Sequence, residues 1–346
     1  MNIFEISSVL VTISAILMYV NFRFLKLPMT LGLMLLSLLF SLVIFAISSF
    51  VPSLHQFFTT LLNSIDFNAT LMGGMLSFLL FAGSLHVDLN DLLEQRLIIS
   101  ILATFGVIFS TFMVGTMTYY LLGLFSIEIK YIYCLLFGSL ISPTDPIAVL
   151  GILKETNTPK SLETTIAGES LFNDGVGVVV FTVILSLATG GAELSFGNIS
   201  FLFIEEAVGG ILFGLILGYL FFKLLRSVDN YPVEIMLTLA LVMGGYSLAS
   251  YLHLSGPLAM VVAGLFIGNH GKMFAMSDAT HKQLFSFWEL IDEFLNALLF
   301  VLIGFEVLII SFNLSYFLAG VILIPLILTV RFTGISIPLL FLGAKS

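Results

Sequence analysis

Charged residues are scarce in this sequence. Only 10% of its 346 residues are Asp, Glu, Lys or Arg, against about 25% in an average soluble domain. Hydrophobic residues make up 59%, and the mean hydropathy is +1.15. A soluble protein of this size needs more polar cover than this, so the composition excludes the soluble globular, disordered, fibrous and nucleic-acid-binding classes. It indicates a protein that crosses a membrane several times.

Cysteine is nearly missing as well. The single cysteine, Cys134, lies inside an apolar segment, which excludes a disulfide within the chain and a cysteine-based metal site. The first residues carry no basic stretch and no small-residue cleavage site follows them. We therefore interpret the first apolar stretch as a retained span and not as a signal peptide.

Long apolar runs, by contrast, fill the sequence. A helix that crosses the bilayer needs about 20 apolar residues, and these runs are far longer than the strands of a membrane β-barrel. We predict an all-α polytopic membrane protein in which residues 1–346 form one transmembrane domain. The eleven expected helices cover residues 7–24, 29–50, 70–86, 97–122, 131–153, 165–189, 203–225, 233–252, 256–270, 287–311 and 315–342.

The basic residues predict how these helices are oriented. With eleven spans, ten basic residues fall in loops on one side and a single one, Lys130, falls on the other. Such an excess marks the cytoplasmic side, so we expect the N-terminus outside. The ten are Arg23, Lys26, Arg96, Lys154, Lys160, Lys223, Arg226, Lys272, Lys282 and Lys345.

One expected span contains an acidic residue between two prolines. Pro143 and Pro146 each remove a backbone donor and push the preceding residue out of the helical region. The pattern predicts an interrupted helix at Thr144–Asp145, which is typical of ion sites in secondary transporters. The alternative is a proline kink in which Asp145 caps the second half-helix.

The next span carries four polar residues on one face. Glu169 and Asn173 are four residues apart, as are Ser170 and Asp174, and such positions are neighbours on a helix. Asp174 falls near the middle of the span. This oxygen-rich face suits a hard cation or a carboxylate that carries a proton. The alternative is a patch of hydrogen bonds between helices.

Three further side chains, Arg331, Glu306 and Trp288, have positions in the expected spans that suggest a role or a depth in the membrane. Arg331 lies inside the last span, and a buried cation needs an anion, so we expect an ion pair with Glu169 that leaves Asp174 as the titratable carboxylate. Glu306 falls late in its span, near the outer interface. Trp288 is expected to be an anchor at headgroup level, and the scattered histidines do not indicate a metal site.

These motifs resemble those of the NhaP-type cation/proton antiporters, the branch that includes the animal sodium/hydrogen exchangers. The resemblance covers about residues 70–342 in the family's order. The matching segments are SPTDPIAV at 142–149, GESLFNDG at 168–175, LSGPLA at 254–259, AGLFIGN at 263–269, FWE at 287–289 and NALLFVLIG at 296–304.

The resemblance implies a fold of about thirteen helices in two inverted repeats. A dimerisation domain would stand beside a mobile core, here residues 97–189 and 315–346. It also implies that Asp174 binds either cation or proton, that Thr144, Asp145 and Ser170 contribute to a sodium site, that Asn173 supports it, and that Glu169 pairs with Arg331. The family continues through a second interrupted helix, so we expect this chain to stop two helices short.

The function implied is electroneutral sodium/proton antiport by alternating access, in a homodimer of the cell (inner) membrane. We expect no catalytic residue and no enzyme activity, and no cofactor besides the transported Na⁺ and H⁺; no nucleotide-binding motif is present. Two alternatives stay open. The same residues suit K⁺/H⁺ exchange, and a truncated paralogue would assemble without transporting.

Overall fold

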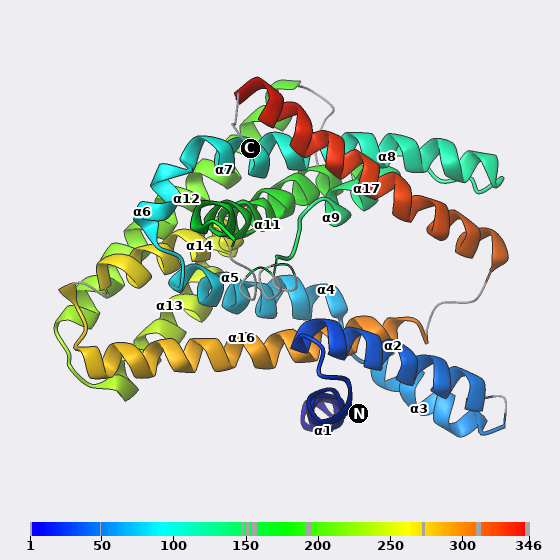
Figure 1. Ribbon diagram of the computed structural model, residues 1–346, viewed down its shortest axis with the longest axis horizontal. Helices are drawn as coiled ribbons and strands as arrows, with labels where there is room; N and C mark the ends of the chain where they lie inside the picture. Colours follow the sequence, from blue (N-terminus) through cyan, green and yellow to red (C-terminus); the bar gives the residue numbers. More distant parts are fainter. Residues whose placement is uncertain are drawn as a thin grey trace.

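The computed structural model describes residues 2–48, 50–146, 149, 153, 158–190, 196–271, 274–308 and 313–342. Within these ranges every regular element is a helix and no strand occurs, which confirms the all-α prediction (Figure 1). The helices are α1 (Ile3–Val20), α2 (Met29–Ser48), α3 (Pro52–Asn63), α4 (Phe67–Thr70), α5 (Leu76–Leu85), α6 (Leu89–Glu94), α7 (Arg96–Ile101), α8 (Val107–Leu124), α9 (Tyr131–Ile141), α11 (Lys160–Ala188), α12 (Phe196–Arg226), α13 (Tyr231–Tyr251), α14 (Gly256–Phe266), α16 (Asp278–Glu306) and α17 (Leu314–Leu342).

Short π-helical turns interrupt or extend four of these helices. They cover Asn21–Leu25, Leu71–Met75, Leu102–Gly106 and Ile267–Gly271. The turn at Leu102–Gly106 joins α7 to α8 into one long rod. Such turns often mark functional sites, and this one borders a small cavity described below.

Each of the eleven expected spans overlaps a helix, although α9 ends at Ile141, well within the span expected over residues 131–153. Fewer helices are long and apolar enough to cross a membrane. Seven meet that requirement in the described part of the chain, among them α11 and α17. The apolar helices Leu71–Leu85 and Tyr131–Ile141 are shorter. The count of eleven spans, the inverted repeat and the outside N-terminus remain predictions. Residues Lys154, Lys272 and Lys345, and most of the expected helix beyond Pro146, lie outside the described residues.

Two groups of helices pack around α5. Helix α11 packs against α9 and α7, and α17 packs against α8, while α16 packs against α1, α2 and α13. Helix α5 contacts both α14 and α16. Figure 1 shows α16 along one edge of the molecule beside α1–α3, with α8, α11 and α17 on the other side of α5. The assignment of residues 97–189 and 315–346 to a mobile core remains a prediction.

Small residues bring α8 and α9 together. A Cβ at Gly115 would lie 2.9 Å from the carbonyl oxygen of Cys134, and one at Gly138 would meet the carbonyl oxygen of Thr111. In a lipid bilayer the hydrophobic effect does not drive helices together, and close backbone contact of this kind stabilises their association. It fixes the end of α9, from which the interrupted segment leaves.

The expected interfacial position of Trp288 is wrong. Its side chain is fully buried in the core shared by α5, α13, α14 and α16. The indole lies 4.7 Å from the ring of Phe81, centroid to centroid. Its N–H donates to the Thr238 hydroxyl at 3.0 Å, so the one polar group of the ring is satisfied without a headgroup. The sequence motif around Trp288 thus marks packing.

Candidate ion-binding site

The interrupted helix lies where the two prolines predict it. Helix α9 ends at Ile141, and the chain from Thr144 to Pro146 is not helical. Without N–H groups at Pro143 and Pro146, the chain cannot continue the helical ladder. The carbonyl groups of this segment therefore need other partners, since unsatisfied backbone groups are costly in an apolar setting.

Side chains from three other helices satisfy the segment. The Thr111 hydroxyl of α8 donates to the Ser142 hydroxyl at 3.3 Å. The Arg331 guanidinium of α17 donates to the carbonyl oxygen of Pro143 at 3.3 Å. The Ser170 hydroxyl of α11 donates to the carbonyl oxygen of Thr144. The interruption is thus a braced structure, held on three sides.

Close packing against α11 fixes the segment further. A Cβ on Gly177 would run into the ring of Pro143. Only glycine lets the broken segment lie flat on α11 at this point. The segment and the polar face of α11 therefore form one unit.

Glu169, Asn173 and Thr144 form a closed hydrogen-bond network. The Asn173 amide donates to the Glu169 carboxylate and to the Thr144 hydroxyl, both at 2.7 Å. The Thr144 hydroxyl donates to the same carboxylate at 3.2 Å. Asn173 is fully buried. These bonds give the half-buried Glu169 carboxylate a structural role, because a carboxylate partly removed from water needs hydrogen-bond donors.

Asp174 faces a different environment. It lines a cavity of about 440 Å³ together with Asp145 and Ser170. Among the described residues no hydrogen bond or ion pair engages its carboxylate. Negative charge on Asp145, and to a smaller extent on Glu169, repels charge on Asp174. A carboxylate placed this way gains from binding either a cation or a proton.

The position of Asp174 along its helix is central. Helix α11 runs from Lys160 to Ala188, so Asp174 lies fourteen residues from either end. At 1.5 Å per residue the helix is about 44 Å long. The structure thus brings together Thr144, Ser170 and Asn173 around the broken segment, and it puts Asp145 and Asp174 on the cavity wall.

Two polar residues of this cavity were missed by the sequence analysis. Asp292 and Asn296 of α16 also line it, one turn apart on the same face of the helix. The expected helix started at residue 287, which left Asp292 near an end. The real helix starts at Asp278, so Asp292 lies fourteen residues from either end. Its i, i+4 spacing with Asn296 was the available signal.

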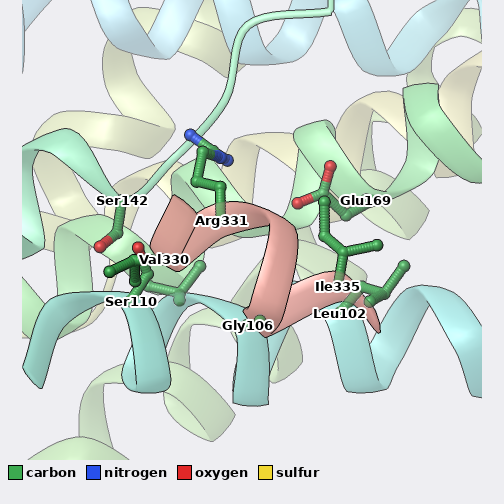
Figure 2. Close-up of a pocket in the computed structure, with 10 residues that line it drawn as sticks. Leu102, Gly106, Ser110, Ser142, Glu169, Val330, Arg331 and Ile335 are labelled. Atoms are coloured by element: carbon green, nitrogen blue, oxygen red, sulfur yellow. The ribbon is translucent and has the colours of Figure 1, made fainter. Parts of the chain in front are cut away.

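The expected ion pair between Glu169 and Arg331 is not formed in this structure. Arg331 reaches the broken segment instead, and the carboxylate of Glu169 is engaged by Asn173 and Thr144. Both residues line a second cavity of about 20 Å³. Figure 2 shows them around it, with Ser110 and Ser142 on the same walls. The two groups therefore share a cavity without direct contact.

Other ionisable groups do not converge on one point. In the described residues no three His, Cys, Asp or Glu side chains lie close enough to hold one metal ion. Glu306 is the last residue of α16, in agreement with its expected place late in a span. Asp174 and the hydroxyl of Ser170 on the cavity wall are oxygen donors, which suit a hard cation.

Comparison with known proteins then decides the family. The sequence profile described as "Sodium/hydrogen exchanger, transmembrane" matches residues 10–345. The chain belongs to this family. It is 50% identical over 332 residues to the Na⁺/H⁺ antiporter NhaP of Pseudomonas aeruginosa, covering 94% of this chain and 78% of that protein. It is 36% identical over 246 residues to the antiporter NhaH of Halobacillus dabanensis, covering 70% of this chain and 59% of that protein.

A solved structure shows the same fold. The sodium proton antiporter MjNhaP1 from Methanocaldococcus jannaschii, solved at pH 8, matches with a TM-score of 0.77. The match covers all of this exchanger and 80% of that chain, at 22% identity. At that identity the likeness establishes the antiporter fold of the described helices and leaves the chemistry to the residues themselves.

Proposed function

We propose that this protein exchanges Na⁺ for H⁺ at Asp174. One observation carries the proposal: at the centre of α11, one carboxylate is engaged by two neighbours while the next faces a cavity with no partner among the described residues. A charged carboxylate without a partner at the centre of a membrane helix is energetically unfavourable unless it binds a cation or a proton. The choice of Na⁺ and H⁺ as the two ions follows from the relatives, which are named as Na⁺/H⁺ antiporters.

Competition for a single group couples the two ions. Deprotonated Asp174 binds Na⁺ with help from the hydroxyls of Ser170 and Thr144 and from the broken segment. Protonated Asp174 is neutral and leaves no charge for Na⁺. Because the empty, charged carboxylate is unfavourable to carry across the membrane, neither ion leaves productively unless the other replaces it. Asp145 acts as a supporting polar residue, and Asn173 positions Thr144.

Alternating access then needs a movement between the helix groups. Side chains of α8, α11 and α17 hold the broken segment, whereas α16 packs with α1, α2 and α13. We expect the first group to move against the second and expose Asp174 to the two sides in turn. The remaining expectations belong to the same proposal: a homodimer in the cell membrane, with its N-terminus outside.

Reconstitution in vesicles tests the proposal. The purified protein is placed in vesicles with an internal pH dye, and Na⁺, Li⁺ or K⁺ is added outside at equal concentration. We expect proton release from the vesicles with Na⁺, and none from empty vesicles. Equal or greater release with K⁺ favours K⁺/H⁺ exchange. Wild-type vesicles that give no signal with any of the three cations contradict the proposal and support the non-transporting alternative.

A further inference from the structure

Asp292 is a third carboxylate on the cavity that holds Asp174, and nothing in the mechanism above uses it. The cavity walls are otherwise largely apolar, with leucines and Phe181 among the lining residues. Asp292 is not close enough to Asp174 and Asp145 for the three to hold one ion. Its charge nevertheless repels that of Asp145. Asp292 therefore influences ions in the cavity through its electrostatic field and not through direct coordination together with Asp145 and Asp174.

Asp292 has a buried polar neighbour on the same helix face. Asn296 lies one turn further along α16 and also lines the cavity, with only 8% of its surface exposed. The neighbours Glu289 and Glu293 are exposed and do not line the cavity. Of the three acids in this stretch, only Asp292 lines the cavity.

We propose that Asp292 is a positioning residue that concentrates Na⁺ in the cavity and presents it to Asp174. A charge in a space with low-dielectric walls focuses its field and raises the local concentration of counter-ions. Asp292 belongs to α16, which does not pack extensively with α11. Asp292 therefore raises the Na⁺ concentration near Asp174 only in the state in which the cavity lies between these two helices. The inference rests on the proposed exchange at Asp174.

The rate of exchange against Na⁺ concentration tests this role. We expect Asp292→Asn to raise the KM for Na⁺ by about three- to tenfold with kcat within twofold of wild type, because only the local concentration of Na⁺ falls. Asp292→Glu, which keeps the charge, should restore the KM. Glu293→Gln and Glu289→Gln remove the same charge from the exposed face and should change neither quantity.

The failures of the two proposals look different. If Asp292→Asn has the same KM as Glu293→Gln, the role of Asp292 is refuted while exchange at Asp174 stands. If Asp292→Asn does not fold, the Glu variant decides, since a KM raised in folded Asp292→Glu contradicts a role for the charge. If wild-type protein gives no exchange, or Asp174→Asn still exchanges, the function itself is refuted.

A different observation concerns the small cavity between Glu169 and Arg331. Its volume of about 20 Å³ exceeds the roughly 10–15 Å³ that one water needs. Four polar side chains line it: Ser110, Ser142, Glu169 and Arg331. The hydroxyl of Ser110 is buried and has no hydrogen-bond partner in the described part of the protein. Such a hydroxyl calls for a partner, because an unpaired buried polar group is destabilising.

The geometry points to one ordered water bound in this cavity that links Arg331 to Glu169. The guanidinium donates to the water, and the water donates to the carboxylate. The Ser110 hydroxyl forms a further hydrogen bond with the same water, so the hydroxyl is no longer without a partner. The two charges would then stabilise each other through a bridge, which accounts for a shared cavity without a direct ion pair. Ser110 of α8 is the residue that positions the water.

A matched pair of substitutions on α8 tests the water site. Thr118 is also buried with an unpaired hydroxyl, but it does not line either cavity. Removing an orphan hydroxyl relieves a penalty, whereas removing a water ligand creates one. We expect Ser110→Ala to lower the melting temperature by about 2–4 °C, and Thr118→Val to leave it unchanged or raise it.

Two outcomes would overturn the water site. One is a Ser110→Ala protein as stable as wild type or more stable. The other is a high-resolution density map of the wild type that shows this cavity without a water peak. If Ser110→Ala does not yield folded protein, the density map alone decides. Neither result depends on whether the protein transports an ion.

Discussion

Helices α11 and α16 are built alike and used differently. Each is 29 residues long, and each carries an aspartate at its midpoint, Asp174 in one and Asp292 in the other. Around Asp174 the neighbouring polar residues are bound into the broken segment. On α16 the polar neighbour of Asp292 on the cavity wall is Asn296, one turn further along the helix. The two central carboxylates thus differ in that a second element is packed around only one of them.

The broken segment explains the difference. It brings carbonyl groups and a hydroxyl to the face of α11, and those groups need partners from α11 and α17 in return. Helix α16 has no such element packed against Asp292 among the described residues. Its stability comes from a core of large side chains that includes Trp288 and Phe305. The comparison predicts that substitutions near Asp174 act on both stability and transport, and that those on α16 act mostly on one of them.

The largest loss of stability is expected from Glu169→Ala. Asn173 and Thr144 would lose their shared acceptor, and Arg331 would face no anion across the small cavity. Breaking a buried charged network by removing one member typically costs about 3–5 kcal/mol. Chemical or thermal unfolding in detergent measures it, with Asn296→Ala on α16 as the matched control, expected near 1 kcal/mol. Equal losses in the two variants would show that both aspartates have similar support.

A smaller loss is expected from Gly177→Ala. The added methyl meets the ring of Pro143, so the broken segment must shift away from α11, and overpacking of this kind costs about 1–3 kcal/mol. Gly244 of α13 has open space around it. Gly244→Ala should therefore be neutral or stabilising, since alanine is the better helix former. Unfolding measurements on both variants check this, and a Gly177→Ala protein of wild-type stability with wild-type transport would mean that the close approach is dispensable.

Much of the site could be predicted from the sequence, because its residues are close together along the chain. Two prolines dictate the break before and after Thr144–Asp145, and i, i+4 spacing puts Glu169 with Asn173. Asp292 could not be placed in the same way. Its distance from Asp174 along the sequence carries no information, and the charges before residue 287 hid the true start of α16. Contacts between helices far apart in sequence needed the structure.

The structure has no direct salt bridge between Glu169 and Arg331, for a related reason. The sequence shows that a buried cation needs an anion, but it does not show which acceptors lie within reach. The freed carbonyl of Pro143 is one such acceptor, and Asn173 and Thr144 are competing donors for Glu169. Trp288 was misplaced because its neighbours in sequence look interfacial, whereas its partner Thr238 comes from another helix.

A loss of about 1 kcal/mol is expected from Thr238→Val on the α16 side. The substitution keeps the shape of the side chain and removes the acceptor of the Trp288 N–H, which leaves one buried donor unpaired. Exchange kinetics should stay at the wild-type level, since neither residue lines the cavity. Unfolding and flux assays on the same preparation measure both effects. A clear change in the KM for Na⁺ would mean that packing on α16 also sets the position of Asp292.

The smallest expected effect is none at all, and it concerns the membrane potential. Asp174 is the unengaged carboxylate of the polar α11 face, and its neighbour Asn173 carries an amide that does not ionise. Asp145 supports the site and Asp292 stays on its own helix, so neither crosses with the ion. If exchange takes place at Asp174 as proposed, one Na⁺ moves against one H⁺, and no net charge is transferred. A potential does work only on net charge, about 2.3 kcal/mol per elementary charge per 100 mV. Exchange should therefore be the same with and without a potassium–valinomycin potential, and it should follow the ion gradients alone.

A rate that rises or reverses with the potential, in vesicles with protein but not in empty ones, would make a second carboxylate a carrier. Repeating the measurement with Asp145→Asn and Asp292→Asn would then identify which one, since only the carrier's removal restores insensitivity.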